Sequence, residues 1–305
     1  MLLLTGATGQ VGSALLGRLL ADGVQVRCLV RDPRRLGAQR VRVQIALGDL
    51  ADPPSFRNAM RGVDTVVHLA AAIRDQPQGS IEELNAIATW RMVQAARQAG
   101  VQRFLFFSAI GASPHHRCRF FRAKALAERA VIEAGIDCVI FAPSIVYAPA
   151  DHWLTLIERL SLLGLTAVPG NGRATFQPIW TEDVADCVMA ALRAGVPHGT
   201  PDGHPVATGG AHLCYELAGP QTLSHDDIIR LVLRSHGRRT TPLHVPSGVV
   251  AAALRTLERA MGERAPVTWD EAELMQVPML AARGAADCEA LGVLPQHMQA
   301  VLGTS

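Results

Sequence analysis

The chain has 305 residues and carries 29 basic and 27 acidic side chains, which leaves a formal net charge of +2. This balance excludes the strong general attraction to nucleic acid that a basic protein has, so no nucleic-acid partner is expected. No apolar run approaches the ~18 residues that a membrane span needs. Six scattered cysteines without a C-x-x-C pair indicate free thiols in a reducing compartment. We therefore expect a cytoplasmic protein without a signal peptide, with one large domain or two coupled ones.

The first twenty-one residues predict a strand, a glycine-rich turn and a helix, in that order. An apolar run at 1–4 leads into TGATGQVG at 5–12, and residues 13–21 have apolar side chains at helical spacing. In this context three glycines spaced G-x-x-G-x-x-G favour dinucleotide binding. The first permits the tight turn, the second lets the backbone approach a pyrophosphate, and the third lets the helix pack on the strand. The helix N-terminus would add free N–H groups for the phosphates. The predicted pyrophosphate contacts are Gly6, Ala7, Thr8, Gly9, Gln10, Val11 and Gly12.

The second predicted strand, 24–30, is followed at once by a basic turn. In a dinucleotide-binding sheet the end of this strand meets the adenosine ribose. Arg31 and Arg35 suit the 2′-phosphate of NADP(H), because an arginine fork makes charge-assisted bidentate bonds. Asp32 keeps NAD(H) open as the alternative, and a solvated basic turn is the interpretation without a ligand. We expect NADP(H).

The third predicted strand, 41–47, alternates apolar and polar residues and ends in Gly-Asp-Leu. Asp49 would accept a hydrogen bond from the adenine amino group, or else cap the short helix predicted at 54–60. Both interpretations stay open. Asp49 and Leu50 are therefore included among the expected cofactor contacts.

The fourth predicted strand, 65–69, runs into a series of alanines. Leu69, Ala70 and Ala71 would let the cofactor lie against the backbone. His68 is interpreted as a packed histidine rather than an acid or base.

The rest of the first half alternates helix and strand. A capping box at 80–83 opens a helix that ends at residue 99. The elements that follow are a strand at 103–107, a helix at 121–134 and a strand at 137–141. This alternation predicts a doubly wound parallel sheet of the Rossmann type, with ligand at the carboxyl ends of its strands. We place an NAD(P)-binding Rossmann domain at 1–147 and a smaller C-terminal α/β lobe, interleaved with it, at 148–305.

The second half has a different rhythm, with frequent proline, glycine and threonine at 164–181. Its predicted elements are a helix at 181–194, a loop at 195–212, a strand at 213–217 and helices at 225–235 and 247–261. The last helix is amphipathic. Its apolar face would pack on the chain's own sheet, or would meet a protein partner or a membrane surface, which would place the protein at the periphery of the inner membrane.

Short motifs recur along the chain in an order typical of one family. They are GATGQVG at 6–12, GDL at 48–50, HLAA at 68–71, Asn85, RFLFFS at 103–108, RAKA at 122–125, PSIVY at 143–147, FQP at 176–178 and EDVA at 182–185. With them the chain resembles the extended and atypical members of the short-chain dehydrogenase/reductase superfamily. Its tail motifs, VTWD at 267–270 and LGVLP at 291–295, resemble the subgroup that contains the NADPH-binding accessory subunit of mitochondrial complex I and its bacterial relatives.

The resemblance implies a catalytic tyrosine four residues before the family's lysine, and this chain lacks it. Lys124 matches the lysine, which holds the nicotinamide ribose, but the position four before it is Phe120. Ser108 matches the serine that orients the substrate oxygen. A phenyl ring cannot exchange a proton, so the general acid of the family is missing. The resemblance also implies cofactor contacts at Pro143, Ser144 and Ile145.

Three other side chains could act as the general acid in place of the tyrosine. His115 and His116 lie just before Phe120, and a histidine can do acid–base work near neutral pH, but an exposed polar loop is the favoured interpretation. Tyr147 is expected to line a pocket. Adjacent His115 and His116 diverge and have no second ligand pair, so no metal site is expected.

Two functions follow from these observations. The first is an NADP(H)-binding scaffold or redox-linked protein. The second is an NAD(P)H-dependent oxidoreductase or epimerase that uses a substitute acid or base.

Overall fold

The computed structural model describes residues 1–149, 151–161, 166–194, 211–238 and 242–303. Most of the predicted loop 195–212 lies outside the described residues. Within them no helix combines the length and the apolar character that crossing a bilayer requires.

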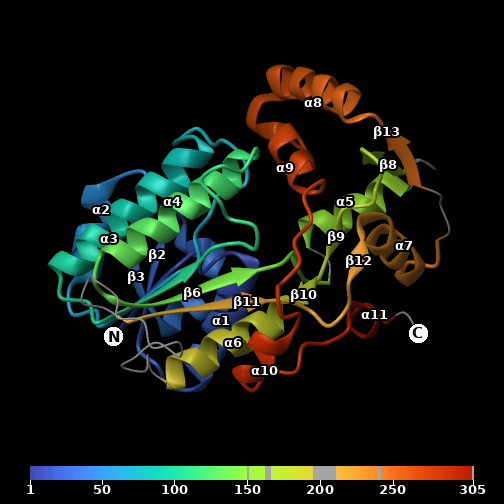
Figure 1. Ribbon diagram of the computed structural model, residues 1–305. Coiled ribbons are helices and arrows are strands. Elements are labelled where there is room, and N and C mark those ends of the chain that lie inside the picture. Colours follow the sequence, from blue (N-terminus) through green and yellow to red (C-terminus); the bar gives the residue numbers. More distant parts are fainter. Residues whose placement is uncertain (150, 162–165, 195–210, 239–241, 304–305) are drawn as a thin grey trace.

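Seven parallel strands form the central sheet, in the order β11-β6-β5-β4-β1-β2-β3 (Figure 1). Their bounds are β1 Leu2–Thr5, β2 Val26–Val30, β3 Gln44–Leu47, β4 Thr65–His68, β5 Arg103–Phe107, β6 Asp137–Pro143 and β11 His212–Leu217. The strand order reverses between β1 and β4, which is where open α/β sheets bind their ligands. The predicted doubly wound parallel sheet is confirmed.

Helices cover both faces of this sheet, because its central strands are apolar on both sides. Leu4 on β1 joins a core built with α1 and α6, while Leu3 faces a core built with α2, α3 and α4 (Figure 1). The helices are α1 Gln10–Ala21, α2 Pro53–Arg57, α3 Ala88–Gln98, α4 Arg119–Glu133 and α6 Thr181–Ala194. Both α6 and β11 come from the second half of the chain, so that half completes the sheet layer. The proposed boundary at residue 147 stays a prediction.

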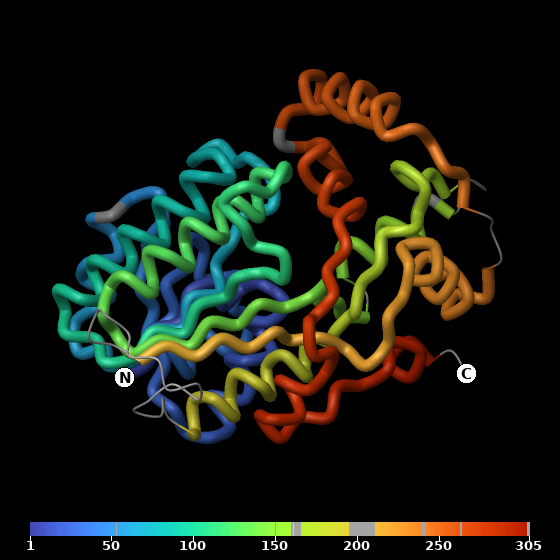
Figure 2. The backbone as a smooth tube through the Cα atoms, viewed as in Figure 1, coloured from blue at the N-terminus to red at the C-terminus, as the bar shows by residue number. Residues whose placement is uncertain are grey.

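Most of the other elements of the second half gather beside the carboxyl ends of the strands, around a third core (Figure 2). Short strands pair there as β7 Val146–Tyr147 with β10 Ile179–Trp180, β9 Thr175–Phe176 with β12 Leu223–Ser224, and β8 Thr166–Pro169 with β13 Pro242–Val245. The helices are α5 His152–Ser161, α7 His225–Ser235, α8 Ser247–Met261, α9 Trp269–Leu274, α10 Ala286–Ala290 and α11 Met298–Val301. Helix α8 stands away from the sheet and buries only Ala251 (Figure 1).

The elements predicted at 41–47 and at 80–99 differ in part from the observed ones. The strand expected at 41–47 is only β3, because a 3-10 segment, η1 Pro33–Arg42, occupies its first residues. The alternation there belongs to an exposed edge, where Val41 is 81% exposed.

The helix expected at 80–99 contains a five-residue π segment, η3 Glu83–Ile87. The Asn85 side chain there accepts a hydrogen bond from Ala72 N (3.1 Å) and donates to Ala72 O (2.7 Å). This widened turn ties the helix to the loop that follows β4.

Candidate functional site

The glycine turn between β1 and α1 is held close to the loop after β4. Gly6 has φ +72°, and a Cβ on it would lie 2.7 Å from Ala70 N. A Cβ on Gly12 would lie 2.1 Å from Gly6 O, so α1 can pack on the turn only with glycine at this position. Gly9 forms the N-cap of α1 with extended backbone and no capping side chain. The first N–H groups of α1 are therefore left for an anion.

A cavity of about 250 Å³ opens above this turn, at the carboxyl ends of β1, β2 and β4. Among the predicted cofactor contacts, those at positions 6–9, 31, 35, 49, 50 and 69–71 line it. Residues that the sequence reasoning missed also line it: Thr5, Leu29, Val30, Gly48, Ala72, Gln76 and Leu84. The flanking residues of each motif were the available signal for most of them, whereas Gln76 comes from a loop without a motif.

Two arginines stand at the β2 end of this cavity. Arg31 donates a hydrogen bond from Nη1 to Gln76 Oε1 at 3.2 Å, and Arg35 also lines the cavity. The Asp32 carboxylate accepts a hydrogen bond from Arg34 N at 2.9 Å and so begins η1. The two cationic side chains therefore face the cavity, while one oxygen of the carboxylate holds the local turn.

Asp49 closes a turn at the other side of the cavity. One of its carboxylate oxygens accepts a hydrogen bond from Ala51 N at 2.9 Å. The N-cap position of α2 belongs to Asp52, so the interpretation of Asp49 as the cap of that helix is wrong. An adenine contact by Asp49 stays a prediction, and the side chain does line the cavity.

His68 is fully buried at the end of β4. Its ring nitrogens lie 2.7 Å from Thr5 Oγ1 and 3.1 Å from Thr89 Oγ1. Burial, and to a smaller extent the charge of Lys124, lowers the pKa of His68 to about 3. His68 is thus a neutral, packed histidine at physiological pH, as the sequence indicated.

Lys124 is the single lysine of the chain, and it is almost completely buried. Its Nζ donates a hydrogen bond to Phe107 O at 2.6 Å and lies 5.0 Å from the centre of the Phe106 ring and 5.7 Å from that of Phe120. Burial lowers the pKa of Lys124 to about 7, although the Glu128 carboxylate opposes the shift. This lysine can therefore exchange a proton near neutral pH.

Ser108 follows β5 close to this lysine. Its hydroxyl is buried and makes no hydrogen bond of normal geometry among the described residues. Neither Ser108 nor Lys124 lines the cavity above the glycine turn. Such an unsatisfied buried hydroxyl is costly unless another group supplies a partner.

The remaining predicted cofactor contacts do not line that cavity. Gln10, Val11 and Gly12 belong to the first turn of α1, beneath it. Ser144 donates to Met279 O at 2.7 Å and accepts from Gln177 N at 3.1 Å, so its hydroxyl links β6 to the C-terminal lobe. Pro143 ends β6, and Ile145 packs against the third core.

The side chains that were considered as a substitute acid lie in different surroundings. His115 is exposed, whereas His116 accepts a hydrogen bond from Cys118 N at 3.0 Å and meets the Phe121 ring edge-on at 4.6 Å. Burial and the Arg117 charge lower the pKa of His116. Tyr147 is fully buried, its hydroxyl has no hydrogen-bond partner among the described residues, and burial raises its pKa. The expectation that Tyr147 lines a pocket is not met by either cavity described for this chain.

Comparisons with known proteins agree with a nucleotide-binding site at the glycine turn. A family model with the description NAD(P)H-binding matches residues 6–194. Sterol demethylase protein B of Methylococcus capsulatus is 35% identical over 182 residues, which is 52% of this chain and 56% of that protein. The mitochondrial NADH dehydrogenase [ubiquinone] 1 alpha subcomplex subunit 9 of Arabidopsis thaliana is 27% identical over 238 residues, 74% of this chain and 56% of that protein. The chain thus spans little more than half the length of these two relatives.

Among solved structures, the UDP-glucose 4-epimerase of Thermus thermophilus in complex with NAD has the same fold. It superposes with a TM-score of 0.70 at 18% identity, and the match covers 99% of this chain and 96% of the epimerase chain.

Proposed function

This chain belongs to the NAD(P)H-binding family of atypical short-chain dehydrogenases/reductases, with distant homology to the complex I subunit, and on that premise we propose that it holds NADP(H) as a nucleotide-binding scaffold or redox-linked protein. The observation that carries the proposal is the pairing of an open glycine turn at one end of the site with a phenyl ring beside Lys124 at the other. The glycine turn binds a nucleotide, whereas the phenyl ring of Phe120 has no proton to donate.

The residues of the first cavity fit a dinucleotide. The backbone of the turn at Gly6 and Gly9 and the uncapped first turn of α1 would hold the pyrophosphate. Arg31 and Arg35 would hold the 2′-phosphate, because they are the cationic side chains that line the cavity. Lys124 would hold the nicotinamide ribose, and in the same region lies the buried Ser108 hydroxyl, which has no hydrogen bond of normal geometry among the described residues.

The side chain of Phe120 favours a function in which the protein does not reduce a carbonyl substrate by the family's route. When bound, a reduced nicotinamide nucleotide supplies a hydride, and the oxyanion formed from a carbonyl substrate must then receive a proton. In this chain the position that we assign to the family's tyrosine carries only carbon. The bound nucleotide would then stabilise the fold or report the redox state of the nicotinamide pool.

The second candidate function is an NAD(P)H-dependent oxidoreductase or epimerase in which Lys124 itself gives the proton. The observation in its favour is that the chain uses arginine at every other basic position and keeps a lysine only here, where burial lowers its pKa to about 7. An ammonium group with such a pKa is matched to neutral pH for general acid catalysis. A lysine with the ordinary pKa of about 10.4 would be poorly matched to this task, and burial removes that objection.

The proposal also includes a role for helix α8 and a division of the chain into two domains. The exposed helix α8 would offer its apolar side chains to a protein partner or a membrane surface, which agrees with a cytoplasmic protein at the periphery of the inner membrane. The dinucleotide-binding domain would occupy 1–147, and the C-terminal lobe would occupy 148–305.

The test begins with the purified protein. Released nucleotide is identified by mass spectrometry, and NADPH and NADH are titrated by calorimetry. We expect NADPH to bind more tightly than NADH, with no oxidation in the presence of aldehydes, ketones or quinones. Failure of both nucleotides to bind would overturn the proposal, and NADPH oxidation that is lost in Lys124→Met would favour the second candidate.

A further inference from the structure

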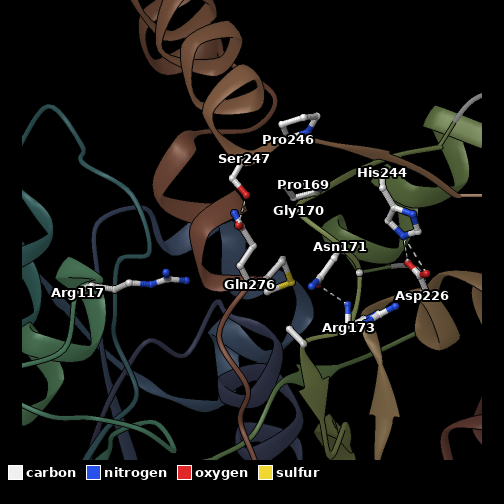
Figure 3. Close-up of a pocket in the computed structure, with 13 residues that line it drawn as sticks. Arg117, Pro169, Gly170, Asn171, Arg173, Asp226, His244, Pro246, Ser247 and Gln276 are labelled. Carbon is white, nitrogen blue, oxygen red and sulfur yellow. Dashed lines mark hydrogen bonds and ion pairs between the residues drawn. The ribbon is translucent and has the colours of Figure 1, made fainter.

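A second cavity, of about 790 Å³, lies between the loop that precedes α4 and the C-terminal lobe (Figure 3). Its walls come from Arg117, the segment 169–174 between β8 and β9, Asp226 on α7, His244 on β13, Pro246 and Ser247 at the start of α8, and Met275 with Gln276 after α9. None of these residues lines the first cavity. The volume falls in the range of small-molecule sites, roughly 300–1,000 Å³.

The segment 169–174 contains a glycine at the point where two polar side chains pack against it. Gly172 has φ +66°, and a Cβ on it would lie 2.0 Å from Asp226 Oδ1 and 2.7 Å from His244 Nε2. Glycine at this position therefore lets the Asp226 and His244 side chains lie directly on the loop. A larger residue would push both side chains out of the wall.

Most of the polar wall is already hydrogen-bonded within itself. Ser247 donates to Gln276 Oε1 at 2.6 Å, and Arg173 N donates to Asn171 Oδ1 at 3.1 Å (Figure 3). These bonds hold the wall in place. Among the described residues, the guanidinium groups of Arg117 and Arg173 are the charged parts of the wall without an ion-pair partner.

The charges of the wall are unequal. Asp226 is the only carboxylate among the described residues that line the cavity, and it lies 3.0 Å from His244 Nε2 and 3.7 Å from Arg230 Nη2. Arg117 extends toward the loop from the α4 side, and Arg173 lies on the loop itself (Figure 3). Within the described part of the chain, neither guanidinium forms an ion pair with a carboxylate. The cavity therefore carries unneutralised positive charge.

We propose that this second cavity binds a small organic molecule through an anionic oxygen group, a phosphate or a carboxylate, held by Arg117 and Arg173. A guanidinium fork matches both groups bidentately. The side chain of Met275 and the rings of Pro169 and Pro246 give the organic part an apolar contact. The site stands on different residues from the proposed cofactor site, so it does not depend on nucleotide binding.

The test uses phenyl phosphate and benzoate as anionic probes and benzyl alcohol as the neutral one. Each is titrated by calorimetry into the wild-type protein saturated with NADPH, and into the Gly9→Val variant without NADPH. Saturation keeps the probes out of the first cavity, and the variant shows whether the second site works when cofactor binding fails. We expect an anionic probe to bind in both settings and benzyl alcohol not to bind.

Removal of either arginine should weaken the anionic probe by about ten-fold or more, because a charge-assisted hydrogen bond is lost. Arg173→Lys should retain part of the affinity. Arg57→Ala is the matched control, since Arg57 is an exposed arginine on α2 that lines neither cavity. Comparison of the anionic probes decides between phosphate and carboxylate.

A second measurement locates the probe without any arginine variant. The imidazole NMR signal of His244, assigned from its loss in His244→Gln, should shift when the anionic probe is added. Equal binding of benzyl alcohol, unchanged affinity in both arginine variants, an equal loss in Arg57→Ala, or an unmoved His244 signal would each overturn the proposal.

Discussion

The Lys124 ammonium lies 5.7 Å from the centre of the Phe120 ring, one turn earlier on the same helix. The ring covers the lysine but offers it no hydrogen bond, and Nζ instead donates to Phe107 O. Attraction between the cation and the π face of a ring is modest, so it does not replace water as a partner. Burial therefore dominates and lowers the pKa of Lys124 to about 7.

The first prediction concerns this pKa and stability. Because the pKa of Lys124 is lower in the folded state than in the unfolded state, the unfolded chain binds more protons between about pH 7 and pH 10.4. The free energy of unfolding contributed by this group should therefore rise as pH increases from 7 toward 10. Urea unfolding at pH 7 and pH 9 measures it, and Lys124→Met should remove this part of the pH dependence.

The single lysine also allows the pKa to be read directly. Protein labelled with ¹³C-lysine should give one side-chain signal, which titrates near pH 7 in the free protein. A titration midpoint near the ordinary value of about 10.4 would contradict the electrostatic interpretation of this site.

The second prediction concerns the missing hydroxyl. Wild-type protein should not reduce aldehydes, ketones or quinones with NADPH by the family route, and Phe120→Tyr should gain activity, because general acid catalysis is worth about 10²–10⁴ in rate. The cofactor's absorbance follows the reaction, and Phe120→Leu is the control that changes the ring without adding a hydroxyl. Robust wild-type turnover that survives His115→Ala and His116→Ala but disappears in Lys124→Ala would show that a family-like mechanism persists without the tyrosine.

The third prediction separates NADP(H) from NAD(H) at Arg31. A charged hydrogen bond contributes about 1.5–3 kcal/mol, so Arg31→Ala should weaken NADPH by roughly ten-fold or more and leave NADH nearly unchanged. Calorimetry with both nucleotides measures the difference. Arg40→Ala is the matched control, since Arg40 is exposed on η1 and does not line the cavity. If Arg31→Ala weakens both nucleotides equally, Arg31 is only part of a basic turn.

The fourth prediction tests the glycine turn at the position where substitution disturbs the backbone least, since a Cβ on Gly9 would lie 3.3 Å from Gly6 O. Gly9 has φ −82°, which any residue adopts, whereas substitutions at Gly6 and Gly12 would collide with backbone atoms. Gly9→Val should fold normally and lose NADPH affinity, because its side chain occupies the space of the phosphates. Gly9→Ala should have a smaller effect. Unchanged affinity in Gly9→Val would place the nucleotide elsewhere.

The fifth prediction concerns α8. Val249 is 59% and Met261 44% exposed on this helix. If the helix meets a membrane or a partner, wild-type protein should sediment with liposomes or respiratory membranes, and Val249→Glu should reduce the bound fraction. Ala252→Glu adds the same charge at an exposed position on the same helix and serves as the control. Protein that stays monodisperse and unbound would instead support packing within the chain.

Local pattern was enough to predict the fold class and the glycine turn. Periodicity depends on residues close in sequence, which is why β5 and α8 were predicted with their observed bounds. The glycine at position 6 was predictable for the same reason, because a tight strand-to-helix turn limits which residues fit. Val41 shows the limit, since alternation does not reveal that this residue lies in an exposed 3-10 segment rather than in the strand.

Properties that depend on distant segments followed only from the packing of the chain. The pKa of Lys124 is lowered because β5 and α4 together bury its side chain. Phe107, which accepts the hydrogen bond from Nζ, lies on a different element, so local sequence could not predict this burial. The Arg31 contact with Gln76 joins two loops, and the second cavity joins five separate segments between residues 117 and 276. Burial and electrostatics are set by which groups the fold brings together. Local sequence therefore specifies a nucleotide-binding fold with a phenylalanine four residues before its single lysine, while the packing of the two halves decides how deeply that lysine is buried and which charged groups come together.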